Sequence, residues 1–226
     1  MAYRGLRQWS VVPVVSLVSL VVAGCLVAGC SASGGTTTSP DGRASGSAGA
    51  APGRQGQASP SSNASANDPA RHAAKVVKRA SQAGVSAQLL MAILYNESYK
   101  PHDPELERQW QRMKPDAAFG VANMHKATFD EVKQGRDFAG RSWDELPDDP
   151  DLAIEAAAWY LHDLAAQLPA GSHGSYTKEE LLALGYNAGP GNMRAFAKGA
   201  KPGAMAQSYL DRLRGNWDKA RQAVRS

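Results

Sequence analysis

From residue 68 to residue 224 the apolar residues recur at helical spacing, and a Gly or Pro residue ends most of the runs. No stretch shows the apolar–polar alternation that is typical of a half-buried strand. Helix-start signals agree with this pattern, because Asp68 precedes Pro69, Ser86 precedes an apolar run, and Thr177 stands three positions before Glu180. The sequence therefore predicts an all-α fold, with one domain over residues 68–226 that is long enough for a single core.

Residues 1–29 have the layout of a secretory signal peptide. Arg4 and Arg7 precede an almost wholly apolar stretch, and small residues precede a cysteine. Such a cysteine resembles the lipidated N-terminus of a bacterial lipoprotein. We favour Cys30 over Cys25 because polar sequence follows Cys30 directly. An uncleaved anchor helix is the alternative. Both interpretations predict an extracytoplasmic protein held at the cell membrane by its N-terminal anchor.

Residues 30–67 are rich in Ser, Gly, Ala, Thr and Pro and contain almost no large apolar side chain. Such a segment cannot bury enough surface to offset its ordering entropy, so we expect a disordered linker. Both cysteines precede it, which leaves the domain without a disulfide or a thiolate metal site. Without the charges of residues 1–67 the net charge falls to +1, so nucleic acid is not an expected partner.

Glu97 is the most informative residue of the domain. It shares one helix face with Leu90, Ile93 and Leu94, and the helix is expected to stop just after it, at Pro101. A carboxylate on an apolar stripe is rarely buried unless it is paired or functional. Burial and the negative end of the helix dipole would both raise its pKa, as a general acid requires. The simpler interpretation is a glutamate that emerges into solvent where the helix ends.

Two further segments contain candidate site residues, each with a simpler structural explanation. Residues 186–191, YNAGPG, place a tyrosine before two glycines, and could merely end a helix. Residues 119–128, FGVANMHKAT, combine a turn glycine, an amide and a methionine, and could be an ordinary junction between a loop and a helix. Neither segment is specific when it is judged alone.

Taken together and in order, these segments resemble the soluble lytic transglycosylase family, whose goose-lysozyme-like domain cleaves peptidoglycan. The resemblance covers residues 85–213, and YNAGPG is its most specific part. The matching features are Glu97-Ser98, residues 120–124, Tyr160-Leu161, residues 186–191 and Tyr209.

The resemblance implies a single lysozyme-like helical domain that cuts the glycan strand without water and leaves a 1,6-anhydro end. Glycan strands of peptidoglycan would be its substrate, with no cofactor and no metal. The resemblance implies that Glu97 is the catalytic acid/base. It implies catalytic support from Ser98 and from Tyr186, which would orient Glu97. The implied substrate-binding residues are Gly120, Asn123, Met124, Asn187 and Tyr209.

The sequence also departs from the family pattern. Asn123 stands where the family usually has Gln, so its amide reaches less far, and residues 104–114 look like an insertion. Trp110 in that insertion could stack on a sugar or pack against the domain, and we favour packing. We interpret Glu155 as a surface acid beside a core stripe.

Two alternatives remain open. A lysozyme-type hydrolase would need a second acid, for which Asp103 and Asp116 are the nearest candidates. A wall-binding lipoprotein would need none.

Overall fold

The computed structural model of the protein describes residues 67–99, 102–171 and 174–225. The predicted signal peptide, the lipidation site and all but the last residue of the predicted linker lie outside these ranges. Within them, no helix combines the length and the apolar character needed to cross a bilayer.

The described ranges are mostly helical, as the apolar spacing predicts, and the helices are joined by short connections. In chain order the elements are η1 (Pro69–His72), α2 (Ala73–Ala83), α3 (Ala87–Glu97), α4 (Pro104–Met113), β1 (Ala118–Phe119), β2 (Met124–His125), α5 (Lys126–Val132), η2 (Trp143–Glu145), α6 (Pro150–Ala166), α7 (Lys178–Ala197) and α8 (Ala204–Ala223).

Side-chain caps fix several of the helix ends. The Ser86 hydroxyl accepts from the Leu89 N–H at 3.2 Å, so α3 begins where the sequence predicts. Thr177 and Glu180 form a reciprocal capping box at the start of α7, with bonds of 3.1 and 2.9 Å. Inside α7, Gly189 leaves the helical region with φ 83° and ψ 163°. The break expected at residues 189–191 is therefore confirmed.

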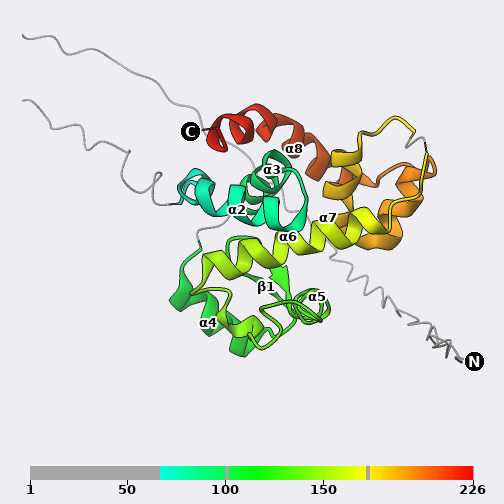
Figure 1. Cartoon of the computed structure of the whole chain (residues 1–226). Helices are drawn as coiled ribbons and strands as arrows, with labels where there is room; N and C mark the ends of the chain where they lie inside the picture. Colours follow the sequence, from blue (N-terminus) through cyan, green and yellow to red (C-terminus); the bar gives the residue numbers. More distant parts are fainter. Residues whose placement is uncertain (1–66, 100–101, 172–173, 226) are drawn as a thin grey trace, which may run out of the picture. The chain divides into compact units, whose positions relative to one another are not determined.

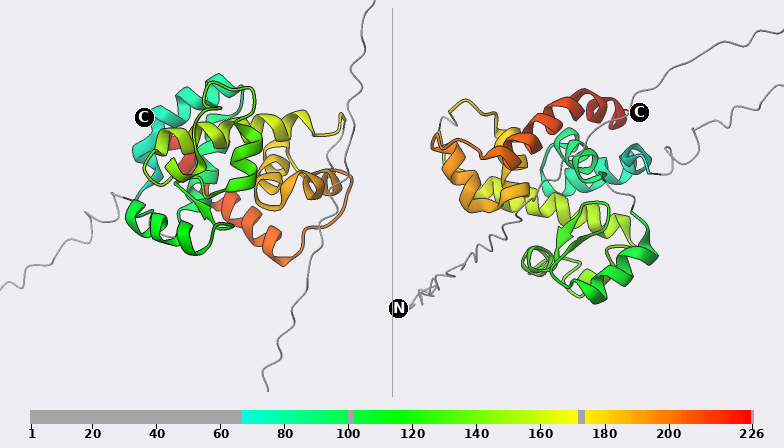
Figure 2. Two further views of the ribbon diagram at one scale, coloured as in Figure 1. Left: turned by 90° about the horizontal axis from the view of Figure 1, so that it is seen from below. Right: turned by 180° about the vertical axis from the view of Figure 1, so that it is seen from behind.

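Helix α3 is the centre of the domain. Every residue from Leu89 to Glu97 is buried, because α8, α2 and α7 pack around this helix. Figures 1 and 2 show α3 enclosed between α2 on one side and the C-terminal helix α8 on the other. An apolar helix surrounded in this way places its last residue, Glu97, inside the molecule.

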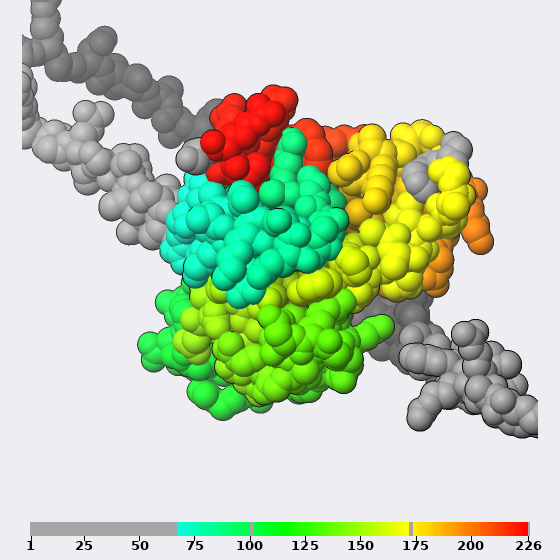
Figure 3. All heavy atoms as spheres, viewed as in Figure 1, coloured from blue at the N-terminus to red at the C-terminus, as the bar shows by residue number. Residues whose placement is uncertain are grey.

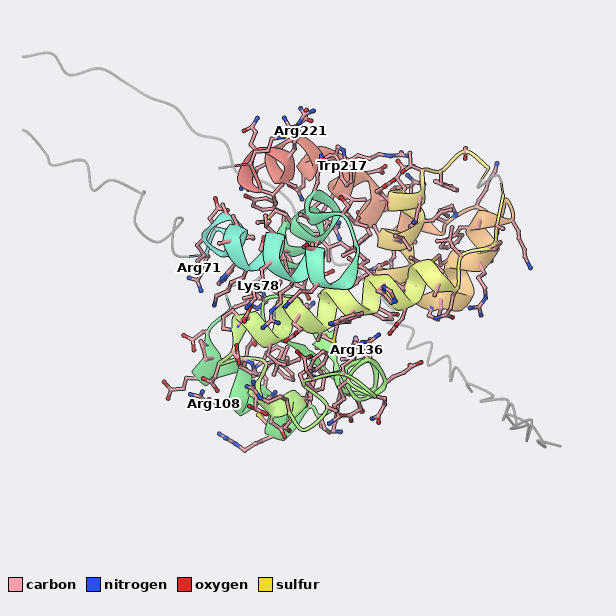
Figure 4. The ribbon with its side chains drawn as sticks, in the orientation of Figure 1. Arg71, Lys78, Arg108, Arg136, Trp217 and Arg221 are labelled. Atoms are coloured by element: carbon pink, nitrogen blue, oxygen red, sulfur yellow. The ribbon has the colours of Figure 1, made fainter. Side chains whose placement is uncertain are left out.

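Helix α6 joins this central group to the segment that contains α4, α5 and the two short strands. It packs against α2, α7 and α5. Arg136 lies between α5 and α6, where its guanidinium is 4.7 Å from the Trp159 ring centroid (Figure 4). The side chains of α2 and of residues 102–160 meet in Figure 3, so the gap between their ribbons in Figure 1 is filled.

A small hairpin is the one departure from an all-α fold in the described ranges. Ala118 pairs with His125 and Phe119 pairs with Met124 in an antiparallel ladder, and residues 120–123 form its turn. The all-α prediction describes the fold but does not include this hairpin, because two-residue strands are too short to produce an alternating pattern. This turn carries one of the predicted site residues, Asn123.

Candidate active site

Glu97 ends α3 and is 7% exposed. The helix stops here because Ser98 closes it. The Ser98 N–H donates to the Leu94 carbonyl at 3.0 Å, and the Ser98 hydroxyl donates to the Tyr95 carbonyl at 2.8 Å. Of the two interpretations of Glu97, emergence into solvent is therefore wrong, and the acid belongs to the interior. A buried carboxylate requires hydrogen-bond partners.

Two side chains from distant parts of the chain donate to the Glu97 carboxyl group. The Asn123 amide Nδ2 lies 3.0 Å from Oε2, and the Tyr209 hydroxyl lies 3.0 Å from Oε1. Asn123 comes from the hairpin turn and Tyr209 from α8. Each carboxylate oxygen thus has its own donor, which holds the group in one orientation.

Burial is the largest influence on Glu97, and it raises the pKa of the carboxyl group above its ordinary value. The hydrogen bonds from Asn123 and Tyr209 oppose this rise, as do the charges of Arg212 and His102. The carboxyl group therefore keeps its proton to a higher pH than a solvated glutamate, yet two donors are ready to stabilise the anion. A group that must give up a proton and then take one back needs both properties.

The backbone of the hairpin turn sets the position of the Asn123 amide. Asn123 has φ 49°, in the left-handed region that asparagine tolerates better than most residues. Its N–H donates to the Gly120 carbonyl at 2.9 Å, which closes the turn. Nδ2 also contacts the Tyr99 hydroxyl at 3.0 Å. The shorter amide therefore reaches Glu97 without the extra methylene of a glutamine.

Tyr209 is held by the residue next to Glu97. The Asn96 amide donates to the Tyr209 carbonyl at 3.0 Å, and the Asn96 side-chain oxygen accepts from Asn216 at 2.9 Å. Burial and the Glu97 charge raise the pKa of the Tyr209 hydroxyl well above its ordinary value, so it stays protonated and can donate. Asn96 and Glu97 thus fasten α8 to the end of α3.

Comparison with known families agrees with this geometry. The sequence matches the Transglycosylase SLT domain over residues 75–220, which spans α2 to α8 and includes Glu97, Asn123 and Tyr209. The chain belongs to this family. No curated protein and no solved structure gives a significant match. As an SLT domain, the chain is a lytic transglycosylase that acts on peptidoglycan.

Tyr186 of the SLT domain does not make the contact that we expected. Its hydroxyl donates to the Ala122 carbonyl at 2.7 Å rather than to Glu97, and its ring lies 5.4 Å from that of Tyr160. The direct contact with Glu97 comes from Tyr209 instead, because α8 packs along α3. Tyr186 therefore supports the hairpin turn through Ala122, and its hydroxyl lies near enough to the acid for the Glu97 charge to help raise the pKa of Tyr186.

The other predicted residues occupy different positions around this SLT site. Ser98 caps α3 directly behind Glu97. Asn187 is exposed. Met124 is 2% exposed and its carbonyl accepts from Trp143 Nε1 at 2.9 Å, so its side chain offers no open surface to a sugar. Gly120 is buried, and its N–H is already bonded to Glu107.

Two interpretations outside the site are wrong. Trp110 is 55% exposed, so it is not a packing residue. Glu155 is buried on α6, and its Oε1 lies 2.5 Å from Arg79 Nη1, so it is not a surface acid. Arg79 of α2 forms an ion pair with Glu155 of α6, and this partner allows the Glu155 carboxylate to be buried.

Sequence reasoning missed four residues of the SLT site: Asn96, Tyr99, His102 and Glu107. Asn96 was visible as a second polar residue within the apolar run of α3. His102 and Glu107 lie in a strongly charged segment, where nothing distinguishes the buried members from the exposed ones. In the described ranges, no group of three or more His, Cys, Asp or Glu side chains is arranged to hold a metal ion.

Proposed function

We propose that this SLT domain cleaves the β-1,4 bond between N-acetylmuramic acid and N-acetylglucosamine and leaves a 1,6-anhydro end. The observation that carries the proposal is the environment of Glu97. Its carboxyl group is buried, has a raised pKa and receives one hydrogen bond on each oxygen. The groups that most affect its pKa include no other carboxylate.

The reaction needs only this one acid. Protonated Glu97 donates its proton to the glycosidic oxygen, and the bond from that oxygen to C1 of the muramic residue breaks. The acetamido group of the substrate stabilises the developing cation. Glu97, now a carboxylate, takes the proton of the 6-hydroxyl while that oxygen bonds to C1. The proton gained equals the proton lost, so the enzyme returns to its starting state.

Asn123 and Tyr209 have a defined part in this cycle. In the proposed cycle Glu97 becomes negatively charged between the two proton transfers, and both donors face the oxygens that carry this charge. Hydrogen bonds to a charged group are stronger than those to a neutral one. The two donors therefore favour the intermediate over the resting state, which is the requirement for catalysis.

Glycosidases that use water have a second carboxylate at a defined distance from the first. The two candidates for that role in this chain are exposed, and neither is among the groups that most affect the pKa of Glu97. Asp103 caps α4 through the N–H groups of Glu105 and Leu106. Asp116 contacts His125 Nδ1 at 2.8 Å through its backbone carbonyl rather than its carboxylate. These positions favour the anhydro-forming reaction over hydrolysis.

Digestion of purified peptidoglycan, followed by mass spectrometry of the released fragments, tests the proposal. We expect 1,6-anhydro ends from the wild-type protein and none from Glu97→Gln. Asp103→Asn and Asp116→Asn should keep activity. Fragments with reducing muramic ends would instead indicate a hydrolase. Equal and negligible release by wild type and Glu97→Gln, with both proteins bound to the wall, would indicate a non-catalytic wall-binding protein.

We also propose that the chain is exported and anchored to the membrane through Cys30. The support is the sequence of residues 1–30, in which a charged and then apolar segment leads to a cysteine. Metabolic labelling with a radioactive fatty acid tests this proposal. Cys30→Ala should abolish the label and release the protein from the membrane, whereas Cys25→Ala should change neither. The reverse result would assign the anchor to Cys25.

A further inference from the structure

Helix α4 has an unusual buried face. A helix on a protein surface normally buries an apolar stripe. In α4 the buried residues are Glu107 and Gln111, while the apolar Leu106, Trp110 and Met113 are exposed. The face that α4 turns toward the domain is therefore polar, and at its centre is a carboxylate that is 6% exposed.

The Glu107 carboxylate contacts the active-site turn. Its Oε2 accepts the Gly120 N–H at 2.8 Å, and its Oε1 lies 2.8 Å from His102 Nδ1. A buried carboxylate without partners would be costly, so these two contacts keep Glu107 in place. Gly120 is the first residue of the turn that ends at Asn123.

The turn is also confined on its other side. A Cβ on Gly120 would lie 2.8 Å from the Leu146 carbonyl oxygen, so the backbone is already in close contact there. Gly120 thus lies between Glu107 and Leu146. The Asn123 N–H donates to the Gly120 carbonyl, so the position of Gly120 helps to fix the position of Asn123. The Asn123 side chain in turn contacts Glu97.

We propose that Glu107 is a positioning residue, which holds the turn at Gly120 and thereby keeps the Asn123 amide against Glu97. The proposal rests on the proposed role of Glu97 as the catalytic acid. Glu107 bonds to Gly120 and His102 rather than to Glu97, so its effect on the acid passes through the turn. Its role explains why α4 buries a carboxylate rather than an apolar side chain, since an apolar residue could not accept the Gly120 N–H.

Three variants separate the possible functions of Glu107. Glu107→Gln keeps an acceptor for Gly120 but loses the negative charge beside His102. Glu107→Ala loses both. Gln111→Ala removes a buried polar side chain one turn further along α4 without touching Gly120, and serves as the matched control. His102 stays unchanged throughout, because its charge also acts on Glu97.

The decisive experiment is a double-mutant cycle between Glu107→Ala and Asn123→Ala, with turnover of soluble glycan strands as the first readout. We expect Glu107→Ala to lower kcat by about tenfold, the effect of losing one hydrogen bond to a charged group, with little change in KM. Glu107→Gln should restore most of the rate, and Gln111→Ala should leave it unchanged. In the Asn123→Ala background, Glu107→Ala should have no further effect on kcat.

The second readout is the pKa of Glu97, followed by NMR titration of its side-chain carboxyl carbon. The Asn123 hydrogen bond lowers this pKa, so its loss in Glu107→Ala should raise the midpoint of the titration. The titration needs no turnover. A wild type that releases no anhydro product would therefore contradict the proposed function, while the Glu97 midpoint would still test the role of Glu107.

Three results would overturn the positioning role. They are equal losses of kcat in both backgrounds, a loss confined to KM, or an unchanged Glu97 midpoint in Glu107→Ala. If Glu107→Ala does not fold, Glu107→Asp replaces it in the cycle. The shorter side chain keeps the charge but withdraws the acceptor from Gly120, so the same outcomes apply.

Discussion

Tyr209 donates a hydrogen bond to Glu97 across 112 positions of sequence, with 3.0 Å between the hydroxyl and Oε1. The contact joins the last helix of the domain to the end of the central one. Asn96 strengthens it, because its amide binds the Tyr209 carbonyl. The orientation of the acid therefore depends on how α3 and α8 pack, as well as on local structure.

Tyr209→Phe should slow turnover and shift its pH dependence. The phenylalanine cannot donate to Glu97, and the Tyr209 hydrogen bond normally lowers the pKa of that carboxyl group. Its pKa should therefore rise, and the high-pH limb of the rate profile should move to higher pH. The loss of one bond to a charged group predicts a decrease in kcat of about tenfold or more. The measurement is kcat against pH.

Tyr186→Phe is the matched control, since its hydroxyl donates to Ala122 rather than to Glu97. We expect a smaller shift of the high-pH limb than in Tyr209→Phe. A larger shift in Tyr186→Phe would show that the sequence-based assignment of Tyr186 as the orienting tyrosine is right in solution.

The folded protein should lose stability through Glu97 as the pH rises. Because the folded-state pKa is raised above the ordinary value of 4.5, the folded protein retains a proton that the unfolded chain releases. Each unit of that shift corresponds to about 1.4 kcal/mol of unfolding free energy. The glutamine introduced by Glu97→Gln does not titrate, so the stability of this variant relative to wild type should increase from pH 4.5 upward and level off above the folded-state pKa.

Urea unfolding at a series of pH values between about 4 and 8 measures this difference. Glu131→Gln replaces an exposed carboxylate on α5 and provides the control. A difference between Glu97→Gln and wild type that stays constant with pH, or decreases, would argue against a raised pKa.

Gly120→Ala should be more damaging than Gly135→Ala, although both glycines have φ 73°. An alanine at either position costs about 1–2 kcal/mol for the left-handed backbone. At Gly135 the new Cβ meets nothing within 4 Å, whereas at Gly120 it lies 2.8 Å from the Leu146 carbonyl oxygen. Overpacking adds about 1–3 kcal/mol. Thermal unfolding and turnover should both decline for Gly120→Ala, and turnover should be preserved in Gly135→Ala.

Trp110→Ala should leave the free energy of unfolding within about 0.5 kcal/mol of wild type, because the side chain is 55% exposed. Trp143→Ala is its buried counterpart. Trp143 is 3% exposed and donates to the Met124 carbonyl at 2.9 Å, so its loss should cost about 3–5 kcal/mol. A comparable loss in Trp110→Ala, measured by urea unfolding, would restore its interpretation as a packing residue.

Local signals made the helices predictable from sequence. Ser86, Thr177 and Glu180 mark helix starts with chemistry that acts within three residues, and the structure uses each of them as expected. The position of Glu97 at the end of an apolar helix was equally readable. Such features depend on neighbours in the chain, which the sequence displays directly.

The partners of Glu97 were harder to predict because they depend on tertiary packing. Tyr186 and Tyr209 both lie on helices, and no local pattern tells which hydroxyl reaches the acid. The burial of Glu107 and Glu155 was missed for a related reason. Each is buried because a distant group, the Gly120 N–H or the Arg79 guanidinium, comes close enough to bind it.

The packing of α8 on α3 also sets the order in which the site can assemble. Protein synthesis proceeds from the N-terminus, so Glu97 is made 112 positions before the tyrosine that binds its Oε1. Until α8 docks, Glu97 lacks one of its two hydrogen-bond donors. Helix α3 also lacks one of the helices that pack against it. We therefore expect a nascent or C-terminally clipped chain to be inactive, and a protease that removes α8 to inactivate the enzyme without reaching Glu97.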